Sequence, residues 1–205
     1  MIPVKVLAVR YLANASSALA KGLGAPKGYP SLAMLTTDCD DATYIALDAA
    51  TKAADVQVSY GRSFYAGAVN ASTPNAGEVI GILAGPTPGA VRSGMEAALG
   101  ALQRIGFEEV NGVPYLAHTV ASVGSFLAKE AGVSAGSAVA YLIAPPLEGM
   151  YAMDAALKAA DVKLCKLDTP PTQTNFGGVL LTGTRSACEA ACAAFAEAVR
   201  EVAQM

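Results

Sequence analysis

Three aspartates within four residues, Asp38, Asp40 and Asp41, are the residues of this 205-residue chain best suited to binding chemistry. Carboxylates at such a spacing could hold a hard cation or a small organic cation. A calcium loop is not predicted, because no glycine follows at its sixth position. The same acids precede a predicted helix, whose free amide groups Asp40 or Asp41 could cap. The sequence leaves helix capping and a functional acidic patch as alternatives.

The four cysteines and the single histidine do not suggest a reactive site. Cys188 and Cys192 lie four residues apart on one face of an alanine-rich helix. A zinc cage needs about four ligands, which these two and His118 do not supply. We therefore interpret the pair as small buried hydrophobic residues, and all four cysteines as reduced thiols. Nucleophile, phosphate-loop and dinucleotide motifs are absent, so no catalytic residue, metal or cofactor is predicted.

The elements that position these residues come from a duplication. Ala46–Val56 reads ALDAATKAADV, and Ala152–Val162 reads AMDAALKAADV, 106 positions later. Two large copies indicate a tandem domain with internal pseudo-symmetry. We predict one domain over residues 1–106 and a second over residues 107–205.

Both halves show the same order of apolar strands and helices, which predicts an α/β fold of the α+β sandwich type. In the first half we expect strands at Val4–Tyr11, Ser31–Thr37, Val56–Tyr60 and Glu78–Ala84, and helices at Asn14–Leu23, from the aspartates to Asp55, and at Ala90–Gln103. In the second half we expect strands at Tyr115–Val120, Ala138–Ile143, Val162–Lys166 and Val179–Leu181, and helices at Val123–Ala131, in the repeated segment and at Arg185–Ala203.

The two copies differ where function is expected. The first carries eight more residues in the loop before its last strand, within Gly61–Gly77. This loop is either a gate or a plain hairpin excursion, with a strand piece at Phe64–Val69. Asp41 aligns with the apolar Leu147. Glu78 aligns with Phe176, so both acids belong to one copy only.

Composition limits the partners. The net charge is −3, so the chain lacks the basic footprint of a nucleic-acid-binding protein. Only 15% of residues are charged and 53% are hydrophobic, which favours an oligomer with apolar interfaces. No continuous apolar stretch is long enough to span a membrane. The N-terminus begins directly with strand-like alternation, so we expect neither a signal peptide nor an address tag.

Long segments of the chain resemble bacterial microcompartment shell proteins. They include SLAMLTTDCDDATYIALDAATKAADVQVSYGRSFYAGA, GEVIGILAGPTPGAVRSGMEAAL, AYLIAPPLEGMYAMDAALKAADV and PPTQTNFGG. The resemblance is to the tandem, circularly permuted class, nearest the L-type shell proteins of ethanolamine-utilisation compartments. It implies a homotrimer that forms a pseudohexameric tile with other shell proteins. These tiles would form the protein shell of a compartment within the bacterial cytoplasm, and this shell is not a lipid membrane.

The resemblance also implies the site residues of a non-enzymatic pore protein. A small pore that binds ethanolamine would use Asp41, Glu78, Phe107 and Thr174. A gated central pore would be lined by loop residues Arg62, Ser63, Phe64, Tyr65, Ala66, Gly67, Thr174, Asn175 and Phe176. The alternatives are a shell trimer of a diol-utilising compartment, or an enzyme or small-molecule sensor that uses Asp38–Asp41.

Overall fold

The computed structural model describes residues 1–64, 79–170 and 172–204, which form two compact units. The N-terminal unit consists of Pro3–Ile105 with Gly124–Phe126. The C-terminal unit consists of Met1–Ile2, Gly106–Val123 and Leu127–Met205. Compact units need not coincide with duplicated segments, so the domain bounds 1–106 and 107–205 stay a prediction.

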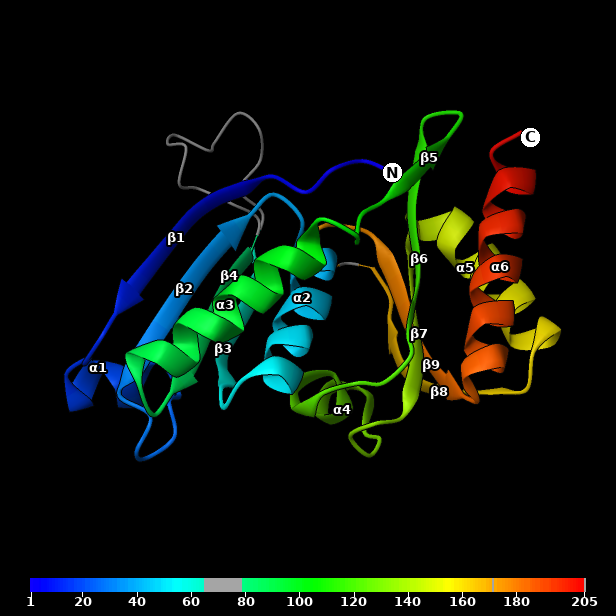
Figure 1. Cartoon of the computed structure of the whole chain (residues 1–205). Helices are drawn as coiled ribbons and strands as arrows, with labels where there is room; N and C mark the ends of the chain where they lie inside the picture. The colour runs from blue at the N-terminus through cyan, green and yellow to red at the C-terminus, as the bar shows by residue number, and fades with distance from the viewer. Residues whose placement is uncertain (65–78, 171, 205) are drawn as a thin grey trace. The chain divides into compact units, whose positions relative to one another are not determined.

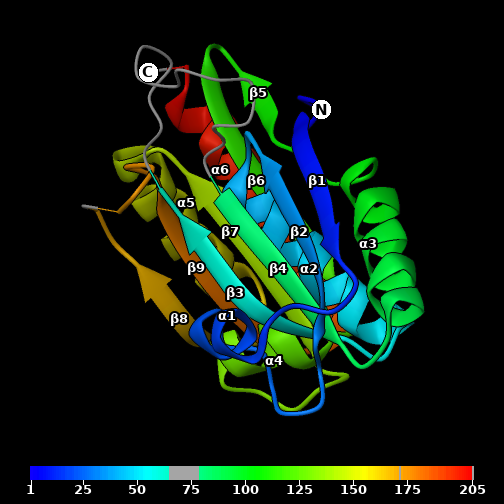
Figure 2. The same ribbon diagram turned by 90° about the vertical axis from the view of Figure 1, so that its left-hand side faces the viewer.

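The N-terminal unit has an antiparallel sheet in the order β1-β2-β4-β3, seen in Figure 2. Its strands are β1 (Val6–Leu12), β2 (Ser31–Thr37), β3 (Gln57–Ser63) and β4 (Val79–Gly85). Its helices are α1 (Ser17–Gly22), α2 (Asp40–Ala53) and α3 (Pro88–Leu102).

Helices α2 and α3 pack against each other and on one face of this sheet (Figure 1). The central strand β4 brings Gly81 under α2, where an added Cβ atom would lie 2.6 Å from Leu47 Cδ1. Glycine at that position therefore lets the helix approach the sheet closely. Thr87 caps α3 by accepting a hydrogen bond from the Ala90 amide at 3.1 Å.

The short helix α1 belongs to the smaller apolar cluster of the same unit. Leu32, Ile82 and Ala84 form its buried centre, and Ala20 and Leu23 pack against them. Alternate residues of β2 and β4 thus serve two clusters, as expected for strands that are apolar on both faces. The predicted helix 14–23 starts three residues later, because Ser16 occupies the N-cap position and accepts a hydrogen bond from the Leu19 amide.

The C-terminal unit repeats this arrangement with a sheet in the order β5-β6-β7-β9-β8. Its strands are β5 (Glu108–Val110), β6 (Val113–Val120), β7 (Ala138–Ala144), β8 (Val162–Asp168) and β9 (Gly177–Gly183). Its helices are α4 (Ser125–Ala131), α5 (Pro146–Ala159) and α6 (Arg185–Val202), of which α4 begins among the residues assigned to the N-terminal unit.

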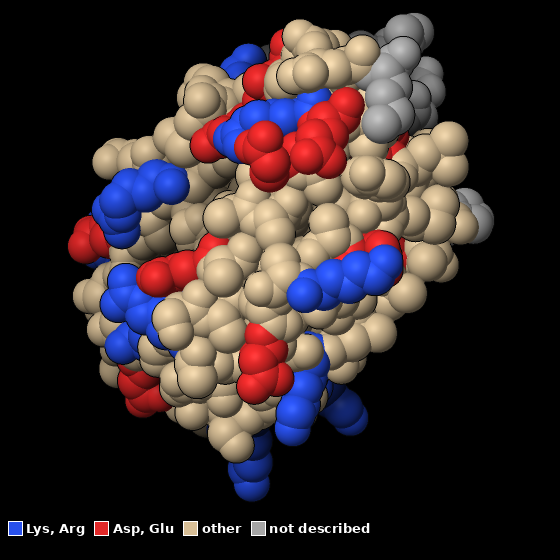
Figure 3. Space-filling view, turned by 90° about the vertical axis from the view of Figure 1, so that its right-hand side faces the viewer, with Lys and Arg blue, Asp and Glu red and all other residues tan. Residues whose placement is uncertain are grey.

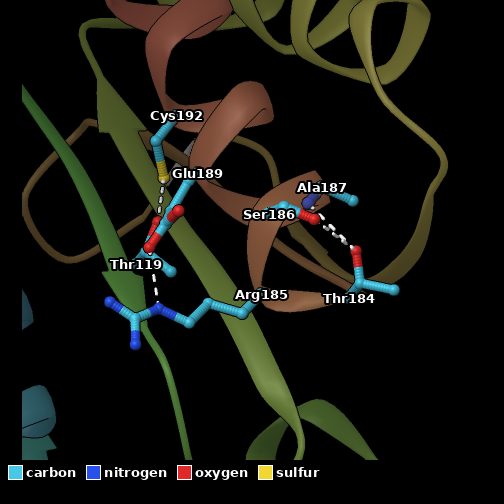
Figure 4. Close-up of polar contacts among 7 residues, drawn as sticks. All are labelled: Thr119, Thr184, Arg185, Ser186, Ala187, Glu189 and Cys192. Carbon is cyan, nitrogen blue, oxygen red and sulfur yellow. Dashed lines mark hydrogen bonds and ion pairs between the residues drawn. The ribbon is translucent and has the colours of Figure 1, made fainter.

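The core of the C-terminal unit lies between the sheet and helices α5 and α6. Phe195 is fully buried there and packs in one cluster with Leu142, Met153 and Leu181. Figure 4 shows how α6 begins: the Thr184 hydroxyl accepts a hydrogen bond from the Ala187 amide at 3.1 Å. The predicted α+β fold of the duplicated chain is confirmed.

A short hairpin was not predicted. Strands β5 and β6 are joined by Asn111 and Gly112, whose φ angles are 49° and 81°. Positive φ at both central positions, with the sequence Asn-Gly, is typical of a type I′ hairpin turn. The predicted strand piece 64–69 falls largely outside the described residues. No helix in the described ranges is long and apolar enough to cross a membrane.

Candidate functional site

The acidic cluster lies at the junction of β2 and α2. Asp38 Oδ1 accepts a hydrogen bond from the Lys5 amide at 2.8 Å, which ties the cluster to the segment before β1. The N-cap position is held by Cys39, which makes no side-chain capping bond, whereas Asp40 Oδ1 accepts a hydrogen bond from the Asp41 amide at 2.9 Å, so an aspartate does satisfy a free amide group of this helix end. Both acids occupy the first turn, where they face the positive end of the helix dipole.

Two buried threonines fix this junction. The hydroxyl oxygens of Thr37 and Thr43 lie 2.7 Å apart. Thr43 also donates to the Cys39 carbonyl oxygen at 2.8 Å, and the Cys39 amide donates to the Thr37 hydroxyl at 3.2 Å. The strand therefore turns into the helix in one defined geometry, which places the acids at this junction.

The acids lower the electrostatic potential around their neighbours. Burial is the main cause that raises the pKa of Tyr44 to about 12, and the negative charges of Asp40 and Asp41 contribute to that rise. Burial and the same two charges, together with Asp38, raise the pKa of the Cys39 thiol to about 12. A site with this potential favours a cation over an anion.

Tyr44 connects the acidic turn to the end of β3. Its hydroxyl lies 2.6 Å from Ser63 Oγ, so the two hydroxyls share a hydrogen bond. Ser63 in turn pairs with Val79 across the sheet, as does Thr37 from the other side. The structure thereby brings together the acids, Tyr44 and the base of the long loop.

The residues predicted to line the pores from the long loop are only partly described by the structure. Arg62 is exposed, and Ser63 and Phe64 are half-buried. Four predicted site residues lie outside the described part of the chain: Tyr65, Ala66, Gly67 and Glu78.

The remaining predicted residues form a local structure in the C-terminal unit. The rings of Phe107 and Phe176 meet edge to face, with centroids 5.9 Å apart. Phe176 closes a turn in which the Thr172 hydroxyl donates to its carbonyl oxygen at 2.9 Å. Asn175 takes a positive φ of 63°, and Thr174 beside it is half-buried. Phe107 thus lies against the turn that carries Thr174.

The cysteine pair of α6 is buried, as predicted. Cys192 Sγ lies 3.2 Å from Thr119 Oγ1 (Figure 4), and burial raises the pKa of this thiol to about 11. A protonated thiol is a poor metal ligand and nucleophile. Across the described residues, no three His, Cys, Asp or Glu side chains gather in a way that could hold a metal ion.

Tyr44 and Ser63 lie near the acids, and the sequence did not predict this neighbourhood. They are 19 residues apart, and only the pairing of β3 with β4 and the packing of α2 bring them together. Tyr44 does fall on the same helical face as Asp40 and Asp41, four and three residues after them respectively, and this spacing could have identified it.

Comparison with known proteins places this geometry in a family. The family model described as the BMC domain matches residues 31–120 and 143–205. The microcompartment shell protein EutL of Clostridium perfringens (strain 13 / Type A) is 56% identical over 207 residues, which cover 99% of this chain and 95% of that protein.

Solved structures give the same result. The crystal structure of ethanolamine utilization protein EutL from Leptotrichia buccalis C-1013-b matches with a TM-score of 0.95 and 55% identity, over 99% of this chain and 95% of the other. The trimeric bacterial microcompartment shell protein PduB shares the fold alone, with a TM-score of 0.79 and 20% identity over 95% and 87% of the two chains. Two repeats of one sheet-and-helix unit, with both repeats matched by the BMC model, establish that this chain belongs to the family of bacterial microcompartment shell proteins.

Proposed function

We propose that this chain is a non-catalytic wall component of an ethanolamine-utilisation microcompartment, and that it assembles as a homotrimer alongside other shell proteins. The similarity to EutL proteins over nearly the whole chain carries this proposal. The surface is consistent with close contact between subunits. Figure 3 shows broad uncharged areas between scattered charges on one face. Elsewhere in the C-terminal unit, exposed charges also pair with each other, as in Arg185–Glu189 and Arg200–Glu197.

The assembly is tested by sedimentation equilibrium. Three chains of 20.7 kDa would give a particle of about 62 kDa. We expect this mass at micromolar concentration, and two-dimensional sheets by negative-stain electron microscopy at higher concentration. A chain that remains at 20.7 kDa under these conditions would overturn the proposal.

We further propose that Asp41, Glu78, Phe107 and Thr174 form a small pore that binds ethanolamine. Ethanolamine is a primary ammonium with one hydroxyl group, so carboxylates would attract its cation and a threonine hydroxyl would exchange a hydrogen bond with its alcohol. The position of Asp40 and Asp41 in the first turn of α2 supports the first part, because it concentrates two carboxylates at one point; their charges also contribute, after burial, to the raised pKa of Tyr44. The contact of Phe107 with Phe176 supports the second, because it joins Phe107 to the turn of Thr174.

Isothermal titration calorimetry with ethanolamine hydrochloride tests this pore. Asp41→Asn removes the charge at constant shape and is expected to weaken binding at least tenfold, about 1.4 kcal/mol. Asp161→Asn changes an exposed acid near β8 and is expected to bind as the unmodified chain does. Equal affinity of Asp41→Asn and Asp161→Asn would refute the assignment. A parallel titration with 1,2-propanediol, which has no charge, separates this function from a diol-utilising one.

The central pore follows from the same family relationship. We propose that Arg62, Ser63 and Phe64, with the loop residues Tyr65, Ala66 and Gly67, and the turn residues Thr174, Asn175 and Phe176 line it. Passage through such an opening requires weak binding, so that a metabolite leaves as readily as it enters.

A further inference from the structure

The C-terminal unit exposes an apolar surface that we call the α5–β8 patch. It comprises Met150, Tyr151 and Leu157 of α5, and Leu164 and Leu167 of β8. Their side chains are between 38% and 52% exposed. A contiguous apolar surface on adjacent elements is typical of an interaction site.

The duplication identifies the matching surface of the N-terminal unit. Helices α2 and α5 both span 14 residues and start 106 positions apart. Strands β3 and β8 keep this offset and carry a register shift at the same place, between Val58 and Tyr60 and between Leu164 and Lys166. Met150 therefore corresponds to Tyr44, and Leu167 corresponds to Gly61.

In the N-terminal unit this matching surface is covered. The segment Gly124–Phe126 lies on it, with the Phe126 ring 5.9 Å from that of Tyr44. An added Cβ atom at Gly61 would lie 3.6 Å from Phe126 Cζ. The Gly124 amide donates to Asp48 Oδ2 at 2.7 Å, and the Asp48 side chain is 0% exposed.

The covering segment has a counterpart in the chain, and that counterpart lies in α1. The Val123 amide donates to the carbonyl oxygen of Ser137, the residue immediately before β7, at 2.9 Å. In the same way, the Ala15 amide donates to the carbonyl oxygen of Pro30, the residue immediately before β2, at 2.8 Å. Residue 126 thus corresponds to Ala18.

The counterpart helix is itself uncovered. None of the residues of α1 is buried, whereas α4 buries three of its seven. Leu127 is 1% exposed, and the corresponding Leu19 is 45% exposed. One chain therefore presents both an uncovered patch and an uncovered copy of the segment that covers such a patch.

We propose that α1 of one chain covers the α5–β8 patch of a second copy of the chain. Each contact then uses different surfaces on its two sides, which is the head-to-tail type, and a rotation of about 120° between successive chains closes it into a ring of three. The inference rests on the proposed trimer and identifies the surfaces that would build it.

Side-chain volumes at the two contacts support this pairing. In the N-terminal unit the large Phe126 lies over Gly61, which has no side chain. In the proposed contact the small Ala18 would meet Leu167. The first contact pairs a large residue of the covering segment with glycine, and the second pairs a small residue of the covering segment with leucine. The total side-chain volume in the two contacts is therefore similar.

At one pair of positions the side-chain volume differs between the contact within the chain and the proposed contact between chains. A Cβ atom at Gly124 would lie 2.2 Å from Thr51 Oγ1. The corresponding residues, Ser16 and Leu157, are both larger. Helix α1 must therefore lie farther from α5 than Gly124 lies from α2, and the contact is expected to be mainly apolar, without a copy of the Gly124–Asp48 hydrogen bond.

Thiol crosslinking tests the surfaces directly. A chain carrying both Ala18→Cys and Leu167→Cys is treated with a short bis-maleimide at micromolar concentration and run on a denaturing gel. We expect dimer and trimer bands for the double variant. We expect no such ladder for either single variant, in which the four native cysteines serve as the background.

The outcomes separate this inference from the proposed assembly. A chain that sediments as a trimer but gives no ladder would overturn the surfaces and leave the trimer standing. A chain that sediments as a monomer would overturn both. As a second variant, Leu167→Glu is expected to raise the concentration of half-assembly at least tenfold, while Ala193→Glu, on the exposed face of α6, leaves it unchanged. Equal assembly of these two variants would also overturn the proposal.

Discussion

Replacing the buried Asp48 with alanine is expected to destabilise the protein by about 3 kcal/mol. Its carboxylate accepts a 2.7 Å hydrogen bond from the Gly124 amide with 0% side-chain exposure, and such a charge-assisted bond contributes about 1.5–3 kcal/mol. The Lys52 ammonium lies 3.4 Å away, but its side chain is 37% exposed, so solvent screening limits this ion pair to a few tenths of a kcal/mol. The hydrogen bond therefore dominates the loss.

The change can be followed by thermal unfolding at one fixed protein concentration, since association also shifts the midpoint. For a chain of this size about 3 kcal/mol corresponds to a fall in Tm of roughly 6–12 °C. The matched control is Glu189→Ala, which removes an exposed i,i+4 ion pair with Arg185 and is expected to cost less than about 0.5 kcal/mol.

Hydrogen exchange identifies where the stability is lost. The amides of Gly124 and Ser125 should exchange faster in Asp48→Ala, because the segment loses its acceptor. They should be unchanged in Glu189→Ala. The Tm of Asp48→Ala could equal that of Glu189→Ala while the amides of Gly124 and Ser125 keep their protection. That result would show that the buried carboxylate does not hold Gly124–Phe126 on α2.

Three further changes test other parts of the fold. Phe195→Ala leaves a cavity in the core of the C-terminal unit and should cost about 3–5 kcal/mol in urea unfolding, whereas Phe195→Leu should cost less. Asn111→Ala forces a side chain without local hydrogen bonding into a left-handed turn, so hydrogen exchange in β5 should speed up by a factor corresponding to about 1 kcal/mol; Asn111→Gly should not show this effect. Burial and nearby acids raise the pKa of Cys39 from 9.0 to about 12, so the folded thiol keeps its proton at a pH where the unfolded one loses it. Stability should therefore fall as pH rises above 9, and a Tm-against-pH profile of Cys39→Ala should fall less steeply; parallel profiles would contradict this.

The elements were predictable where one periodic pattern dominates. The repeated helix agrees with prediction because its apolar residues recur at helical spacing, and the buried strand Ser31–Thr37 agrees because a short continuous apolar run is typical of a strand buried on both faces. The ends were less predictable, because capping depends on small polar residues with several roles. Ser16 starts α1 later than expected, and Cys39 takes the N-cap position of α2, while Asp40 accepts a hydrogen bond from an amide one residue into the helix.

The candidate site was predictable from family resemblance rather than from local pattern. Three clustered acids equally suit a capped helix and a binding site, and the sequence offers no means of choosing. The environment of the acids is long-range: Tyr44, whose pKa is raised first by burial and also by the charges of Asp40 and Asp41, hydrogen-bonds to Ser63 from another strand. Sheet pairing and helix packing create that environment, and neither is encoded in the spacing of the acids.

The duplicated helix shows that a shared sequence motif does not determine burial. Asp48 and Asp154 occupy the same position, and each pairs with a lysine four residues later, yet their side chains are 0% and 63% exposed. The difference lies in what covers each helix, which for the first copy is a segment of the same chain. In the assembly that we propose, the second copy, whose helix has no such cover among the described residues, is completed by another molecule. Tandem fusion thus makes one of two pseudo-equivalent contacts permanent and leaves the other to association, so the strength of the assembly can change by mutation at α1 or the α5–β8 patch without altering the contact within the chain.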